Sequence, residues 1–260
     1  MSFPRLVAFD LDDTLAPSKS VMDPLMGELL LALAGRAEVA IISGGQLSQF
    51  MMQVVDRLPD TGADELSHFH LLPACGTQYY RLSGHSVEMV YARALTEDQK
   101  RRALSVLEEE ARRLGLWESE TWGEILEDRD SQITFSALGQ QAPVDKKSAW
   151  DPTGERKSSL RAAVAARLPD LEVRSGGSTS VDVTEQGIDK AYGMQRLVEQ
   201  TGIALDDMLF VGDRLDQHGN DYPVLAMGVA CHAVGGWEEA ARFVDALLRE
   251  AAPRPVTRAL

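Results

Sequence analysis

Short apolar runs alternate with longer amphipathic stretches in the first third of the chain and again in the last third. Largely apolar runs of four or five residues are typical of strands buried in a parallel sheet. They lie at 6–9, 39–42, 68–72 and 208–211, and a further strand is predicted at 225–230. Apolar residues three or four positions apart predict helices at about 25–34, 46–58, 190–201 and 237–250. This alternation of strands and helices indicates a doubly wound, Rossmann-like α/β sheet.

The pattern changes between residues 83 and 186, where short alternating strands and two helices predict an inserted α+β domain. The first helix begins at the capping box Thr96-x-x-Gln99. The second is marked by apolar residues four positions apart, at Leu160, Val164 and Leu168. We therefore expect a discontinuous core domain formed by 1–82 and 187–260, with a cap domain over 83–186 inserted in it.

One predicted strand of the cap, over 179–184, separates its polar and apolar side chains. Val181 and Val183 fall on one face, whereas Ser180 and Asp182 fall on the other. The simplest interpretation is a strand with one solvated face. Because the strand leads back toward the core, however, its polar face is also a natural place to meet a polar ligand.

The composition of the chain argues against several classes of binding partner. A net charge of −14 on 260 residues argues against a nucleic-acid or anionic-membrane surface. No apolar stretch reaches the roughly 20 residues needed to cross a bilayer, and no signal peptide is apparent. Cys75 and Cys231 stand apart, which fits a reduced, cytoplasmic setting, and a monomer and a homodimer remain equally open. His68-x-His70 fits a metal site less well than the alternation of a strand.

Three carboxylates, Asp10, Asp12 and Asp13, follow the first predicted strand. They repel one another and cost free energy to desolvate, so a fold tolerates them most easily around a cation. Ligands that are all oxygens suit a hard ion such as Mg2+. A polar strand end with a turn is the alternative interpretation of this cluster alone.

Further polar groups follow other predicted strands. Ser43-Gly44-Gly45 follows the second strand, and its glycines let backbone N–H groups approach a phosphate closely. Gly212-Asp213 follows the strand at 208–211, and six residues separate it from Asn220-Asp221. Since catalytic groups gather at the carboxyl ends of parallel strands, we expect these residues to converge with Asp10.

The ordered set resembles the four motifs of the haloacid dehalogenase (HAD) superfamily. The motifs are Asp10-x-Asp12-x-Thr14, Ser43, Lys190 and Gly-Asp213…Asn220-Asp221. A response-regulator receiver also phosphorylates an aspartate, but it is much shorter and lacks both an inserted domain and the last motif. The complete acidic set argues against a catalytically inactive binding protein.

The resemblance implies a role for each motif residue. Asp10 is the nucleophile that forms an aspartyl-phosphate, and Asp12 is the general acid and base. Mg2+ is bound by Asp10, Asp213 and the backbone carbonyl of Asp12. The phosphate is bound by Ser43, Gly44 and Lys190. Asn220 and Asp221 orient Lys190 or metal-bound water. Dehalogenases of the superfamily lack the second carboxylate, so Asp12 favours phosphoryl transfer to or from a small phosphorylated metabolite.

The position of the cap resembles the Cof-type phosphatases and the eukaryotic-type phosphomannomutases. Several motifs look most like the latter, including Gly177-x-x-Ser180-x-Asp182 and Gly187-x-Asp189-Lys190. By that resemblance, Ser180 and Asp182 contact sugar hydroxyls and Arg129 contacts the distal phosphate of a phosphosugar.

Departures from the mutase pattern favour a different reaction. The family's Gly-Gly-Ser is Ser43-Gly44-Gly45 here, Asp13 replaces a glycine, and Gln140 occupies the place of a phosphate-clamping arginine. Lys146 and Lys147 are nearby, but lysine does not reproduce bidentate clamping. The prediction from sequence is therefore a Mg2+-dependent phosphosugar phosphatase, with a phosphosugar mutase as the alternative.

Overall fold

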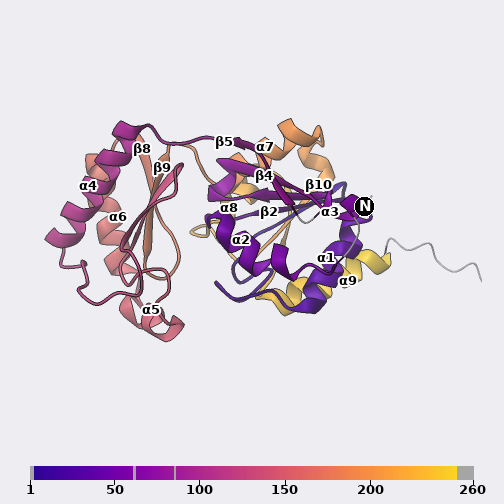
Figure 1. Ribbon diagram of the computed structural model, residues 1–260, viewed down its shortest axis with the longest axis horizontal. Coiled ribbons are helices and arrows are strands. Elements are labelled where there is room, and N and C mark those ends of the chain that lie inside the picture. The colour runs from indigo at the N-terminus through magenta and orange to yellow at the C-terminus, as the bar shows by residue number, and fades with distance from the viewer. Residues whose placement is uncertain (1–2, 61–62, 85, 251–260) are drawn as a thin grey trace, which may run out of the picture. The chain divides into compact units, whose positions relative to one another are not determined.

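The computed structural model describes residues 3–60, 63–84 and 86–250, and the chain forms two compact units (Figure 1). One unit consists of Met1–Tyr91 and Asp189–Leu260, and the other of Ala92–Ile188. The second unit begins at Ala92, whereas the sequence predicts that the cap begins at residue 83. The reason is that β4 (Gln78–Ser83) and β5 (Ser86–Ala92) continue the core sheet beyond β3.

The core sheet has seven strands in the order β11-β10-β1-β2-β3-β4-β5. Its parallel strands are β1 (Leu6–Phe9), β2 (Glu38–Ile42), β3 (Phe69–Leu72), β10 (Met208–Gly212) and β11 (Ala230–Ala233). Phe9 is in register with both Ile41 and Val211, so β1, β2 and β10 end at the same edge. The strand predicted at 225–230 is wrong, because its first two residues belong to α8 (Tyr222–Ala226), where Pro223 near the helix start favours a helix, and β11 begins only at Ala230.

Helices cover both faces of this sheet, which confirms the doubly wound α/β fold. The core helices are α1 (Pro24–Ala34), α2 (Leu47–Gln53), α3 (Ala63–Leu66), α7 (Lys190–Thr201), α8 and α9 (Trp237–Glu250), with short 3-10 turns η1 (Val55–Arg57), η2 (Ala74–Gly76) and η3 (Leu205–Asp207). Side chains of Val7 and Phe9 pack with α1 and α9 on one face, whereas Leu6 and Ala8 pack with α7 and α8 on the other. In α1, Leu30 and Leu33 face the sheet and are buried, whereas Leu25, near the start of the helix, is 52% exposed and lies outside the core.

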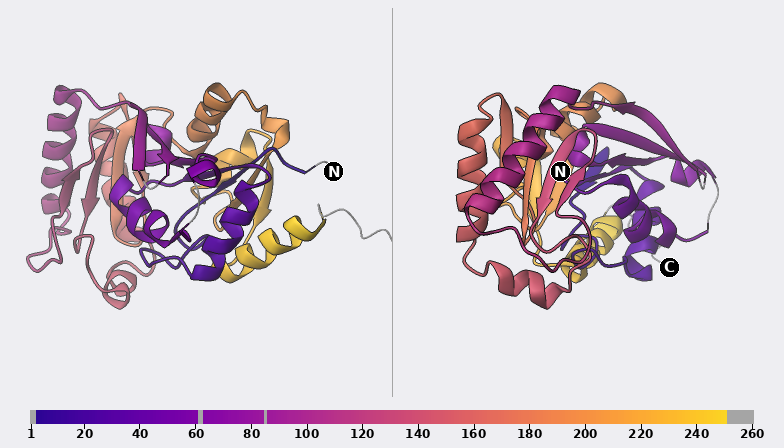
Figure 2. Two further views of the ribbon diagram at one scale, coloured as in Figure 1. Left: turned by 45° about the vertical axis from the view of Figure 1, so that its right-hand side comes forward. Right: turned by 60° about the vertical axis from the view of Figure 1, so that its left-hand side comes forward.

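The second unit is an antiparallel sheet with helices on one face (Figure 2). Its elements are α4 (Glu97–Arg113), β6 (Leu126–Asp128), β7 (Gln132–Ser136), α5 (Val144–Trp150), α6 (Glu155–Arg167), β8 (Leu171–Ser175) and β9 (Ser180–Glu185), and the strand order is β6-β7-β9-β8. The capping box at Thr96 and Gln99 is present. Helix α5 was not predicted, because only Trp150 in it is buried and no apolar period marks it.

Candidate active site

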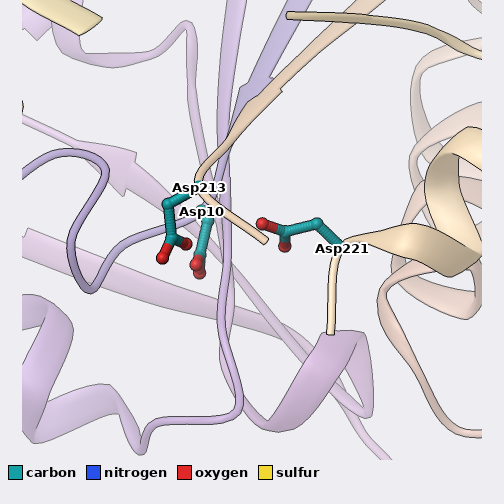
Figure 3. A group of neighbouring side chains, drawn as sticks. All are labelled: Asp10, Asp213 and Asp221. Atoms are coloured by element: carbon teal, nitrogen blue, oxygen red, sulfur yellow. The ribbon is translucent and has the colours of Figure 1, made fainter. Parts of the chain in front are cut away.

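Three carboxylates meet at the carboxyl end of the core sheet (Figure 3). Asp10 follows β1 and Asp213 follows β10, and these strands are parallel neighbours. Asp221 is the residue immediately before α8. One carboxylate oxygen from each of the three residues lies within 4.8 Å of the others. Asp221, which the resemblance gave only an orienting role, is thus part of the acidic cluster itself.

Lys190 is the positively charged side chain next to these carboxylates. It is the first residue of α7, whose start is capped by the side chain of Asp189 accepting from the Tyr192 backbone N–H. Its side chain is 1% exposed, with Nζ 2.6 Å from Asp10 Oδ1 and 2.5 Å from Asp221 Oδ1. Lys190 therefore bridges two carboxylates from opposite ends of the chain.

Asp221 is rigidly held although it lies in a long connection. Its Oδ2 accepts the Arg214 backbone N–H at 3.0 Å, and the residue is fully buried. Gly212 makes room for it, because a Cβ at position 212 would lie 2.4 Å from Asp221 Oδ2. Glycine at this strand end is explained by the close approach of a carboxylate rather than by backbone conformation.

Burial and neighbouring charges together shift the pKa values of the residues in this cluster. Burial raises the pKa of Asp10 from 3.8 to about 8, with Lys190 opposing the rise and Asp221 adding to it. Burial, followed by the charge of Asp221, also raises the pKa of Asp213. Burial alone would lower the pKa of Lys190, but Asp10 and Asp221 raise it above its ordinary value.

These residues fit a bound divalent cation. Three carboxylates face one ammonium group, so an additional positive charge would relieve the repulsion that remains. Carboxylate oxygens are the donors that hard cations prefer. Asp10 and Asp213 both offer such oxygens, whereas the Asp221 oxygens are already engaged by Lys190 and the Arg214 N–H.

Ser43 lies at the same edge, after β2, and is 5% exposed. Its Oγ accepts the Gly45 N–H at 3.1 Å, and its carbonyl accepts the Cys75 N–H at 2.9 Å. The turn that carries Cys75 has positive φ at Ala74, Cys75 and Gly76. Gly193 of α7 packs against it, since a Cβ on Gly76 would lie 2.7 Å from Gly193 Cα. The strained turn thus braces the Ser43 loop and contacts the helix that begins at Lys190.

The side chain of Asp12 takes part in a separate set of contacts. Its Oδ1 accepts the Lys19 backbone N–H at 2.7 Å, and its Oδ2 accepts Gln49 Nε2 at 2.9 Å. Gln53 Nε2 lies 3.4 Å from Oδ1. Sequence reasoning missed both glutamines, although their i, i+4 spacing after the Ser43 loop places them on one face of α2.

Asp13 and Asn220, which also belong to the sequence motifs, are exposed, unlike the residues of the acidic cluster. Asp13 has a φ of 60°, a conformation that aspartate tolerates, and its Oδ1 accepts the Ser18 N–H at 3.0 Å. This explains how an aspartate replaces the glycine expected there. Asn220 is exposed, unlike its neighbour Asp221, and its orienting role stays a prediction.

The cap residues lie on the polar face of their sheet, opposite the face that α4 and α6 cover. Asp182 Oδ1 accepts the Thr134 hydroxyl at 2.8 Å, and Ser180 Oγ lies 3.2 Å from Ser136 Oγ. Gln140 Nε2 in turn donates to Ser136 Oγ at 2.5 Å. We call the group formed by Gln132, Thr134, Ser136, Gln140, Ser180 and Asp182 the cap polar face. Arg129, expected at a distal phosphate, pairs with Glu127 at 2.6 Å and its side chain is 10% exposed.

Comparison with known proteins gives a consistent picture. The family model of eukaryotic phosphomannomutase matches residues 26–250. A probable phosphomannomutase from Caenorhabditis elegans is 24% identical over 256 residues, which cover 94% of this chain and 96% of that protein. The phosphomannomutase of Saccharomyces cerevisiae is 26% identical over 232 residues, which cover 84% of each chain.

Solved structures support the fold. A haloacid dehalogenase-like hydrolase from Bacteroides thetaiotaomicron has a TM-score of 0.62 at 17% identity, covering 94% of this chain and 99% of that chain. An N-terminally truncated IMP-nucleotidase from Plasmodium falciparum has a TM-score of 0.72 at 13% identity, covering 94% and 70%. Across 3–60, 63–84 and 86–250, no helix is both long and apolar enough to span a membrane.

Proposed function

Because the chain belongs to the eukaryotic phosphomannomutase family of the HAD superfamily, we propose that it is a Mg2+-dependent phosphosugar mutase that transfers a phosphoryl group through Asp10. The observation that carries this proposal is the pairing of Asp10 with buried Lys190 next to Asp213 at one sheet edge. Such a site combines an anionic nucleophile with the cations needed to receive a phosphate.

The chemistry follows from the positions of these side chains. An oxygen of Asp10 forms a bond to phosphorus while the bond from phosphorus to the sugar oxygen breaks, and Asp12 gives its proton to that oxygen. In the reverse direction Asp12 takes the proton of the hydroxyl that attacks the aspartyl-phosphate. Lys190 and the backbone N–H groups of the Ser43 loop bind the phosphoryl oxygens. Asp10, Asp213 and the Asp12 carbonyl would hold Mg2+, which would offset the repulsion between the carboxylate nucleophile and the phosphate.

A phosphosugar phosphatase is the second candidate, and the cap polar face favours it. A mutase has to retain a sugar bisphosphate while it turns over, which requires a strong clamp on the phosphate that is not at Asp10. Here Gln140 is neutral, Arg129 pairs with Glu127, and Lys147 Nζ donates to the Gln140 carbonyl at 2.7 Å. The family relatives nevertheless give the mutase stronger support than the loss of one arginine gives the phosphatase.

One incubation separates the two candidates. The protein is mixed with mannose 1-phosphate or glucose 1-phosphate, Mg2+ and a catalytic amount of the corresponding 1,6-bisphosphate. A mutase produces the 6-phosphate isomer faster than free phosphate. Free phosphate that accumulates faster than the isomer would instead support the phosphatase, and a lack of either product would contradict both.

A further inference from the structure

The Asp12 carboxylate is fixed by donors from two segments of the core unit. The Lys19 N–H, in the loop that follows β1, reaches Oδ1 at 2.7 Å. From α2, Gln49 Nε2 reaches Oδ2 at 2.9 Å and Gln53 Nε2 lies 3.4 Å from Oδ1. Since both carboxylate oxygens accept, rotation of the Asp12 side chain about χ1 or χ2 would break at least one of these bonds. The position of this carboxylate is therefore set by α2 and by the loop together.

Gly45 provides the space for the amide of Gln49. A Cβ built at position 45 would lie 2.3 Å from Gln49 Oε1 and 2.8 Å from its Cδ. Gly45 is not among the glycines with positive φ, so its backbone conformation does not explain why the residue is glycine. The missing side chain matters because it lets Gln49 lie over the Ser43 loop and point its Nε2 at Asp12.

Gln53 supports the same arrangement from the next turn of α2. Gln53 is fully buried, and its Nε2 donates to the Ser20 backbone carbonyl at 2.8 Å. The backbone carbonyl of Gln53 accepts the Met22 N–H at 2.9 Å. Its Oε1 has no hydrogen-bond partner among the residues that the structure describes. A buried amide oxygen without a partner lowers the stability of the fold. Gln53 therefore keeps its Nε2 and backbone hydrogen bonds to the loop despite this loss of stability.

We propose that Gln49 is a positioning residue for proton transfer by Asp12, with Gly45 giving it space and Gln53 anchoring the loop that contains Lys19. The inference rests on the proposed function, because it assumes that Asp12 is the acid and base. A neutral amide is well suited to this role. Its Nε2 fixes the direction of the Asp12 carboxylate through a 2.9 Å hydrogen bond and adds no further charge beside the acidic cluster.

The test compares two leaving groups. Gln49→Met removes the amide but keeps a long, unbranched side chain, and Gly45→Ala displaces the amide without altering Gln49. For a sugar 1-phosphate, whose leaving oxygen needs a proton, kcat/KM should fall about 10- to 100-fold in both variants. For p-nitrophenyl phosphate, whose leaving group departs unprotonated, kcat/KM should fall less than about threefold. Ser48→Ala, at an exposed position of the same helix, is the matched control and should change neither value.

Two further measurements guard against a merely structural effect. In an Asp12→Asn background, Gln49→Met should cause almost no additional loss, because residues that act as a unit are not additive. Hydrogen exchange of the Lys19 amide should be faster in Gln49→Met than in the wild type, since its acceptor is no longer fixed.

The outcomes separate this inference from the proposed function. Equal losses on the two substrates, additive losses with Asp12→Asn, or unchanged exchange at Lys19 would overturn the role of Gln49. Absence of any Asp10-dependent turnover in the wild type would overturn the proposed function instead. In that case the exchange experiment still decides whether Gln49 holds Asp12.

Discussion

The active site of the core and the polar face of the cap both bury polar groups, but they do so in opposite ways. In the core, Asp10, Asp213 and Asp221 form an acidic cluster with Lys190, and burial, with the charge of Asp221 adding to it, raises the pKa values of Asp10 and Asp213. On the cap polar face, neutral amides and hydroxyls bond to one another and to Asp182. We therefore expect the core to bind a cation and to carry the phosphoryl transfer, and the cap polar face to form hydrogen bonds with hydroxyl groups of the substrate.

This difference suggests how the two regions divide the work. A charged cluster accelerates a reaction in which charge moves, whereas a set of neutral hydrogen-bond partners discriminates between substrates that present different hydroxyls. Loss of Asp10 or of the metal should therefore affect all phosphoesters alike, and variants on the cap polar face should affect them unequally.

The largest effect is expected from Asp10→Asn. Without a nucleophile, kcat should fall by at least about 10³-fold for phosphosugars and for p-nitrophenyl phosphate. Removing a carboxylate from a repulsive cluster should not lower the melting temperature of the metal-free protein, which calorimetry would test. Asp13→Asn is the matched control, since Asp13 is exposed and asparagine tolerates its positive φ. Substantial activity in Asp10→Asn would contradict the covalent mechanism.

Removal of the metal should have nearly as large an effect. EDTA should abolish turnover of every phosphoester, and Mg2+ should restore it. Asp213→Ala should lower kcat by about 10²-fold or more at ordinary Mg2+ concentrations, because it removes one of the two carboxylates free to bind the ion. Asp216→Ala, in the same connection but exposed, is the control. Full activity in protein treated with EDTA would exclude the metal site.

Asp182→Ala should distinguish the cap from the core. It removes the acceptor of the Thr134 hydroxyl, and it should lower kcat/KM for the preferred phosphosugar by about 10- to 100-fold. For p-nitrophenyl phosphate, which lacks sugar hydroxyls, the loss should be less than about threefold. Equal losses on both substrates would show that Asp182 is structural.

Gln140→Arg should change the partition between isomerisation and hydrolysis. A guanidinium group on the cap polar face adds a charge-assisted contact to a distal phosphate, so the ratio of 6-phosphate isomer to free phosphate should rise about tenfold. Gln141→Arg, which adds the same charge at the adjacent exposed position, is the control. An identical ratio in the two variants would mean that Gln140 does not face the distal phosphate.

The smallest effect concerns stability against pH in the metal-free protein. The pKa of Asp10 is about 8 in the folded chain, above its ordinary value of 3.8. The folded state therefore retains a proton that the unfolded state loses, and the free energy of unfolding falls as pH rises from about 4 to 8. Between pH 5 and 8 the decrease in melting temperature should be smaller by several degrees or more in Asp10→Asn, whose side chain does not titrate. A decrease of the same size in both proteins would assign the dependence to other groups.

The sequence by itself determined the fold class and the sheet edge at which the acidic residues gather. Strand and helix periods are local, so short apolar runs and amphipathic stretches predict a doubly wound sheet without any knowledge of long-range contacts. Parallel strands end at a common edge, which is why residues as distant as Asp10, Ser43 and Asp213 were expected together. The capping box at Thr96 is likewise a local signal, and it is present.

Only the tertiary structure decided which side chains touch. The inclusion of Asp221 in the acidic cluster depends on a close approach to Gly212. The contact between Asp12 and Gln49 joins residues 37 positions apart, and it needs both a glycine at position 45 and the direction of one face of α2. The assignment of β4 and β5 to the core depends on the pairing of β4 with β3 and of β5 with β4, since an alternating strand carries no local mark of the sheet it joins. Periodicity determines which segments fold into which elements, but side-chain contacts between distant segments arise only when those elements pack.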